Sequence, residues 1–162
     1  MGDMLSSLRY MAYSRMGTLP KLQWFEPTPT FWHTMDQWRT DIAFVDAGCG
    51  LGNLTREAKK RGFDMMAVDI CKRVGQVRSV MLMDACVMPY TRNLWPILCR
   101  PSHDGWAYGC ISRALEMGAS ALYVSLPHNA ERDLDDLQSK VSLQVTNVGA
   151  EGETLYLIGA LP

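Results

Sequence analysis

Short apolar runs alternate with amphipathic segments along most of this chain, from residue 42 to the C-terminus. Continuous apolar runs predict buried strands, and apolar residues repeated every three or four positions predict helices. Strands that alternate with helices are typical of a parallel sheet joined by crossover helices. The predicted strands cover residues 42–46, 63–70, 79–83, 95–99, 121–126, 141–148 and 153–158. The predicted helices cover residues 53–61, 106–117 and 129–140.

Glycine and proline refine this pattern at four places. Gly62 and Gly118 directly follow two of the predicted helices and are expected to end them. Pro96 lies in the fourth predicted strand, and its missing N–H predicts a strand start or an edge strand there. The last two strands flank the turn at residues 149–152, Gly-Ala-Glu-Gly, which predicts a terminal hairpin.

Residues 1–40 differ from the rest because they show no clear strand or helix period. Aromatic residues gather there among prolines: Trp24, Phe25, Phe31, Trp32 and Trp38. We interpret residues 1–40 as a lid or an N-terminal wrap, and we expect most of these aromatic residues to pack against the core. With 162 residues, the chain is predicted to form a single domain, residues 1–162, whose main body is residues 41–162.

Composition narrows the class of protein. Hydrophobic residues make up 48% and charged residues 20%, as in soluble globular proteins, and the net charge of −1 does not indicate binding to nucleic acid or to anionic membranes. No stretch resembles a secretory signal or a membrane span, so we expect a cytoplasmic protein, and a homo-oligomer is possible. The cysteines contain no CxxC pair, which predicts buried thiols and no metal site. They are Cys49, Cys71, Cys86, Cys99 and Cys110.

A glycine-rich loop, Ala47-Gly48-Cys49-Gly50-Leu51-Gly52, directly follows the first predicted strand. Glycine tolerates positive φ and lets the backbone approach a ligand closely. The dinucleotide pattern G-x-G-x-x-G would need its third glycine at position 53, where Asn53 stands. No Lys-Ser or Lys-Thr follows the glycines, as a phosphate-binding loop would require. The spacing therefore disfavours NAD, FAD and phosphate.

Acidic residues stand at the ends of three successive strands: Asp46, Asp69 and Asp84. The carboxyl ends of such strands converge on one crevice. Carboxylates suit a ligand with hydroxyl and amino donors and positive charge, and S-adenosylmethionine (SAM) carries a sulfonium, an ammonium, two ribose hydroxyls and an adenine amino group. An Asp after a strand also often caps a helix, and that alternative applies to Asp84.

The segments VDAGCGLGNLT, VDI and MDA resemble motifs of the class I SAM-dependent methyltransferases. The resemblance covers roughly three quarters of the chain. It implies an α/β, Rossmann-like, doubly wound sheet of seven strands, mostly parallel with a C-terminal antiparallel hairpin, and helices on both faces. It implies that the methionine end of SAM lies against Asp46, Ala47, Gly48, Cys49 and Gly50. It further implies that Asp69 accepts from the ribose hydroxyls, that Ile70 packs on the adenine, and that Asp84 and Ala85 meet the adenine edge.

The segment after the fourth strand, Arg100-Pro101-Ser102-His103-Asp104, lies where a substrate base is expected. His103 is a candidate catalytic base, and Asp104 could orient it or act in its place. Arg100 is assigned to the cofactor site and could instead bind a substrate carboxylate or phosphate, or form a structural ion pair. The segment departs from the family's amino-methylating motif, Asp or Asn followed by Pro-Pro and an aromatic residue, and it lacks the Pro-Cys nucleophile of cytosine methylation. His33 and His128 are weaker candidates.

These observations predict a SAM-dependent methyltransferase that leaves S-adenosylhomocysteine (SAH) as product, with a methyl acceptor that the sequence does not identify. A small molecule is slightly preferred, because a chain with few insertions offers little surface for a large substrate. The alternative is a non-catalytic SAM- or SAH-binding protein: a sensor, a sequestering protein or a partner subunit. A Rossmann oxidoreductase is disfavoured by the glycine spacing and by the terminal hairpin.

Overall fold

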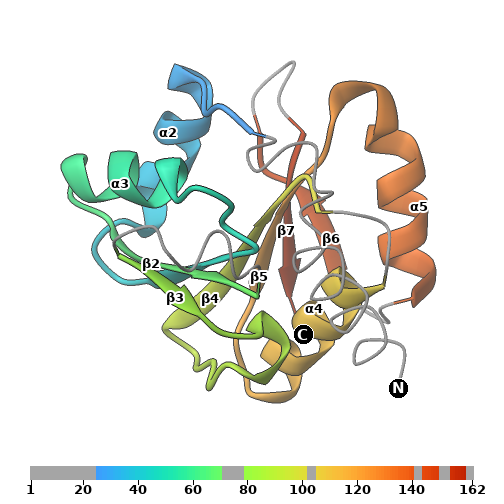
Figure 1. Cartoon of the computed structure of the whole chain (residues 1–162). Helices are drawn as coiled ribbons and strands as arrows, with labels where there is room; N and C mark the ends of the chain where they lie inside the picture. Colours follow the sequence, from blue (N-terminus) through green and yellow to red (C-terminus); the bar gives the residue numbers. More distant parts are fainter. Residues whose placement is uncertain (1–24, 71–78, 102–104, 141–143, 150–153, 160–162) are drawn as a thin grey trace, which may run out of the picture.

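The computed structural model describes residues 25–70, 79–101, 105–140, 144–149 and 154–159. In these residues the strands form one seven-stranded sheet in the order β3-β2-β1-β4-β5-β7-β6 (Figure 1). The strands are β1 (Ala43–Ala47), β2 (Asp64–Asp69), β3 (Val80–Leu82), β4 (Leu94–Cys99), β5 (Ala121–Val124), β6 (Gln144–Asn147) and β7 (Leu155–Gly159). The pairs among β1 to β5 are parallel, and β7 pairs antiparallel with both β5 and β6. The predicted sheet with its terminal hairpin is confirmed.

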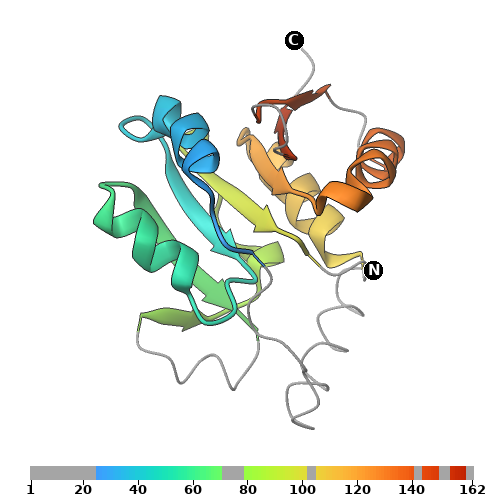
Figure 2. The same ribbon diagram turned by 90° about the horizontal axis from the view of Figure 1, so that it is seen from above.

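Helices cover both faces of this sheet, as predicted. The α-helices are α2 (Pro29–Met35), α3 (Asn53–Lys60), α4 (Trp106–Glu116) and α5 (Ala130–Lys140). Short 3-10 helices are η1 (Asp36–Trp38), η3 (Ala85–Val87) and η4 (Pro127–Asn129). Figure 2 shows α2 and α3 on one side of the sheet and α4 and α5 on the other. None of the helices in the described ranges combines the length and the apolar character needed to cross a membrane.

The sheet faces alternate residue by residue along each strand. In β1, Phe44 packs with the residues of α2 and α3, and Val45 packs with those of α4 and α5. The same alternation separates Ile97 from Leu98 in β4. Because both faces are covered, the central strands are apolar on both sides, which explains their continuous apolar runs.

A helix in the N-terminal aromatic region corrects one sequence prediction. No helix was expected before residue 41, yet α2 forms there. The Thr28 hydroxyl accepts a hydrogen bond from the Phe31 N–H at 3.2 Å, and Pro29 occupies the first helical position. Phe31 and Trp32 are buried against the sheet, so the expectation that most of these aromatic residues pack is confirmed. Residues 1–24, which carry most of the predicted lid, lie outside the described residues.

The position of Pro96 corrects a second prediction. β4 is neither an edge strand nor begun by this proline, since it lies between β1 and β5. Pro96 pairs in register with Val45 of β1, whereas the register with β5 begins only at Ile97. A central strand therefore accommodates the missing N–H at a point where it is paired on one side alone.

The strand order of the sheet reverses direction between β1 and β4. These strands are neighbours, yet from β1 the chain continues to β2 on one side, and from β4 to β5 on the other. Such a switch point leaves a crevice at the carboxyl ends of the strands, where doubly wound proteins bind ligands.

Candidate functional site

The glycine-rich loop joins β1 to α3 with a backbone that other residues disfavour. Gly48, Gly50 and Gly52 have φ angles of 69°, 56° and 77°. Each is in the left-handed region, where a Cβ is strained. The N–H groups of Gly48 and Cys49 both donate to the Val68 carbonyl at 3.0 Å, which holds the loop against the end of β2. Gly48 itself is exposed, so a ligand has direct access to its backbone.

Asp69 is held beneath this loop. Its Oδ2 accepts a hydrogen bond from the Gly50 N–H at 2.9 Å, and the residue is only 2% exposed. The structure thus brings together two residues that the sequence analysis assigned to one site, from the first and the second strand. In this conformation, the same carboxylate stabilises the loop.

Asp46 is buried one strand away, also at 2% exposure. Its Oδ2 accepts a hydrogen bond from the Thr55 hydroxyl of α3 at 3.1 Å. Burial raises the pKa of Asp46 to about 7, the Thr55 hydrogen bond partly opposes this shift, and the nearby Asp69 charge adds to it. The sequence analysis missed Thr55, although its place beside Leu54 in helix 53–61 was an available signal for a buried hydroxyl.

Asp84 follows β3 and begins the third part of the site. Its Oδ1 accepts a hydrogen bond from the Cys86 N–H at 2.8 Å, and it caps η3. The capping alternative is therefore realised. Asp84 and Ile70 are half-buried, whereas Ala85 is buried and its carbonyl accepts a hydrogen bond from the Tyr90 hydroxyl at 2.7 Å.

Arg100 stands at the end of β4 in a strained conformation, with φ of 51°. Its N–H donates to the Val124 carbonyl at 2.8 Å, and its guanidinium lies over the Phe25 ring at 5.3 Å from the centroid. The Cys99 thiol next to it is buried, which raises its pKa; the Asp46 charge raises that pKa further and the Arg100 charge lowers it. The ends of β1 and β4 are therefore close enough to interact electrostatically.

Of the histidine candidates, the structure describes only His33 and His128. His103 and Asp104, the proposed catalytic pair, lie outside the described residues. His33 lies on α2 and His128 on η4, and both side chains are exposed. They remain weak candidates.

Trp106 is a contact that the sequence did not indicate. It is the first residue of α4, and a Cβ built on Gly48 would lie 3.0 Å from its Cη2. The indole edge therefore flanks the glycine loop and leaves no room for a side chain at position 48. An aromatic residue at a helix start has no sequence signature that distinguishes this role from packing.

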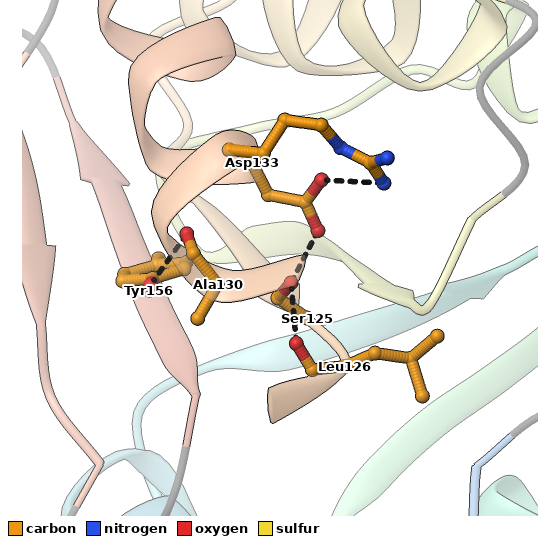
Figure 3. A network of polar contacts seen from close by, with 6 residues as sticks. Ser125, Leu126, Ala130, Asp133 and Tyr156 are labelled. Carbon is orange, nitrogen blue, oxygen red and sulfur yellow. Dashed lines mark hydrogen bonds and ion pairs between the residues drawn. The ribbon is translucent and has the colours of Figure 1, made fainter. Parts of the chain in front are cut away.

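Polar contacts also join the end of β5 to α5 and β7, as Figure 3 shows. The Ser125 hydroxyl donates to Asp133, the Thr154 hydroxyl donates to the Ser125 carbonyl, and the Tyr156 hydroxyl donates to the Ala130 carbonyl at 3.1 Å. Asp133 is 3% exposed, and its Oδ1 lies 3.7 Å from an Arg132 guanidinium nitrogen. This network holds α5 against the carboxyl edge of the sheet.

Comparison with solved structures identifies the fold. An O-methyltransferase from Thermotoga maritima superposes with a TM-score of 0.56 at 11% identity, over 91% of this chain and 71% of that one. Human N-acetylserotonin methyltransferase in complex with SAM gives 0.56 at 14% identity, over 98% and 57%. Precorrin-6y C5,15-methyltransferase from Geobacter metallireducens gives 0.51 at 14% identity, over 87% and 90%. No protein-family model matches the sequence, and a search of curated proteins finds no match. The chain has the class I methyltransferase fold, as its motifs predicted.

Proposed function

We propose that this chain binds SAM at the carboxyl ends of β1, β2 and β3 and transfers its methyl group to an acceptor. The observation that carries the proposal is the set of three acids, Asp46, Asp69 and Asp84, at three neighbouring strand ends around a loop of positive-φ glycines. Fold alone does not determine function, so the argument rests on the chemistry of these groups.

The residues fit the methionine end of SAM. Bound SAM supplies an electrophilic methyl group on a sulfonium, and it also brings an ammonium. The Asp46 carboxyl, with a pKa of about 7, becomes a carboxylate more readily when a cation approaches. The exposed backbone at Gly48 admits a ligand closely, with Ala47, Cys49 and Gly50 forming the rest of that end.

The ribose and adenine are assigned to the ends of β2 and β3. Asp69 would accept from the ribose hydroxyls, and because it is 2% exposed, the loop over it has to shift outward on binding. Ile70 and Asp84 are half-buried and remain reachable for the adenine face and its amino group, with Ala85 beneath them.

Methyl transfer needs the acceptor placed in line with the methyl group, and much of its rate comes from that placement. We assign this task to the end of β4, where Arg100 would contact the cofactor or an anionic group of the acceptor. His103 would accept the proton of the acceptor, with Asp104 orienting it. A small-molecule acceptor is preferred. The four described cysteines are thiols outside any disulfide, which suits a reducing cytoplasm.

A non-catalytic SAM- or SAH-binding protein is the second candidate. It is favoured by Arg100, which stands at the strand end where the amino-methylating family motif has Asp or Asn. Its guanidinium packs on Phe25, so this position already has a structural role. Such a protein would use the same cofactor site and would not release SAH from SAM.

The first test is calorimetric titration of the purified chain with SAM, SAH and NAD. Micromolar binding of SAM and SAH without NAD binding supports the cofactor assignment, and absence of both contradicts it. SAH release from SAM is then measured against pools of small-molecule acceptors. Turnover that is lost in His103→Ala or Asp104→Ala supports the enzyme, whereas binding without turnover in any pool favours the second candidate.

A further inference from the structure

A buried tyrosine and a cysteine hold the turn at the adenine end of the proposed site. Tyr90 is 1% exposed, and its hydroxyl donates to the Ala85 carbonyl at 2.7 Å. The Cys110 sulfur of α4 lies 3.2 Å from the Tyr90 hydroxyl oxygen and 3.7 Å from the Ala85 carbonyl oxygen. With the hydroxyl proton of Tyr90 on the Ala85 carbonyl, the Cys110 thiol can donate to the tyrosine oxygen or to the same carbonyl, and either bond supports this contact.

Neighbouring residues of the same turn are held as well. The Cys86 N–H donates to Asp84, and the Cys86 thiol donates to the Trp106 carbonyl of α4 at 3.3 Å. Each of the three successive residues 84 to 86 therefore makes a hydrogen bond, and two of the residues bond to distant parts of the chain. Trp106 in turn contacts Gly48, so the first turn of α4 touches both ends of the proposed cofactor site.

These contacts matter because η3 has little stability of its own. It is a single 3-10 turn of three residues, and an isolated turn of this kind does not hold its backbone in one orientation. Burial raises the pKa of Tyr90 above its ordinary value, so the hydroxyl stays protonated and remains a donor at neutral pH. Contacts of Tyr90 and α4 with residues 85 and 86 thus hold the turn whose Cys86 N–H binds the Asp84 carboxylate.

We propose that Tyr90, supported by Cys110, is a positioning residue that sets the selectivity of the cofactor site for the adenine base. This inference rests on the proposed function, because it assigns the edge of the adenine to Asp84 and Ala85. Hydrogen-bond selection between two bases needs acceptors held in place, since a site that can rearrange satisfies either base. Tyr90 does not contact the ligand and acts through the Ala85 carbonyl.

The test compares SAH with S-inosylhomocysteine, which carries an oxygen in place of the adenine 6-amino group. The wild-type chain should bind SAH more tightly, by on the order of tenfold or more. Tyr90→Phe keeps the ring and loses the hydroxyl; it should lower SAH affinity by about fivefold to tenfold and affect the inosyl ligand little. The ratio of the two dissociation constants therefore falls toward one. A merely structural role would lower stability and weaken both ligands equally, with an unchanged ratio.

Matched variants separate this effect from general loosening of the core. Tyr123→Phe removes the hydroxyl of another buried tyrosine on the same sheet face, on β5, and should leave the ratio unchanged. Cys110→Ala removes the thiol that contacts the Tyr90 hydroxyl and the Ala85 carbonyl and should lower the ratio by roughly twofold. Cys110→Ser restores a donor and should return the ratio to the wild-type value.

The outcomes distinguish this inference from the proposed function. A wild-type chain that binds neither ligand overturns both. A wild-type chain that binds SAH, with a folded Tyr90→Phe variant of unchanged ratio, overturns the positioning role alone. Should Tyr90→Phe not fold, the Cys110 variants decide: a ratio lowered by alanine and restored by serine supports the role, and an unchanged ratio overturns it.

Discussion

Two halves of the carboxyl edge of the sheet are built in different ways. The proposed cofactor half, the ends of β1, β2 and β3, is held by acids that bind the adjoining loops, such as Asp69 with Gly50 and Asp84 with Cys86, and its η3 turn is also held by Tyr90 and α4. The acceptor half, the ends of β4 and β5, is held by contacts with distant segments: Arg100 with Phe25, and Ser125 with Thr154. The proposed cofactor half therefore combines a sequence motif with long-range support for its η3 turn, whereas the proposed acceptor half shows no such motif.

The largest expected effect concerns the stability of the acceptor half. Asp133→Ala removes the charge-assisted hydrogen bond from the buried Ser125 hydroxyl, which keeps only the Leu126 carbonyl at 3.2 Å as acceptor, and should lower the free energy of unfolding by about 3 kcal/mol. Asp135→Ala, an exposed position on the same helix, should change it by less than about 0.5 kcal/mol. Both are measured by denaturant unfolding. A folded Asp133→Ala variant that also loses SAH binding would show that the two halves are not independent.

The next effect concerns the glycine loop. Gly48→Ala places a Cβ at positive φ and against Trp106, and it should cost about 2 to 3 kcal/mol of stability and lower SAH affinity by about tenfold. Gly118→Ala is the matched control, because its φ is 82° and nothing lies within 4 Å of the new Cβ. It should cost about 1 to 2 kcal/mol without changing SAH affinity. If the two variants lowered SAH affinity equally, the glycine loop would have no special role in binding.

Asp69 tests the cofactor half by ligand affinity. Asp69→Ala should weaken SAM binding by about 1 to 3 kcal/mol, because the ribose hydroxyls and the Gly50 N–H lose their acceptor. Asp64→Ala changes an exposed acid at the opposite end of the same strand and should leave the affinity unchanged. Calorimetric titration measures both. An unchanged affinity in a folded Asp69→Ala protein would refute the ribose assignment.

The smallest effect, taken per pH unit, is a dependence of stability on pH. Because the pKa of Asp46 rises on folding to about 7, the folded chain holds a proton that the unfolded chain has released. The free energy of unfolding should therefore fall as the pH rises from about 4 to about 7, by up to about 1.4 kcal/mol per pH unit, and then level off. Asp46→Asn keeps an acceptor for Thr55 and should lose this slope. Urea unfolding at several pH values measures this slope. An identical slope in the wild-type chain and in Asp46→Asn would show that another group takes up the proton.

The sequence was informative where a structural feature depends on neighbouring residues. The acids after three strands, the glycine loop and the glycines that end helices α3 and α4 could all be predicted, because backbone preferences and strand ends are local properties. The helix α2 was missed despite its Thr28 cap and Pro29. A helix of seven residues has too short an apolar period to detect, and its stability comes from burial of Phe31 and Trp32.

The sequence by itself thus determined the strands and the main helices from residue 42 onward, the terminal hairpin, and the residue types at the edge of β1, β2 and β3. Only the tertiary structure decided that Pro96 fits in a central strand, that Thr55 binds Asp46, and that Tyr90 and Trp106 reach the turn and loop of the proposed site. The physical reason is one of range. Strand periodicity and the φ angle of a glycine depend on consecutive residues. A hydrogen bond between distant segments forms only when packing brings those segments together.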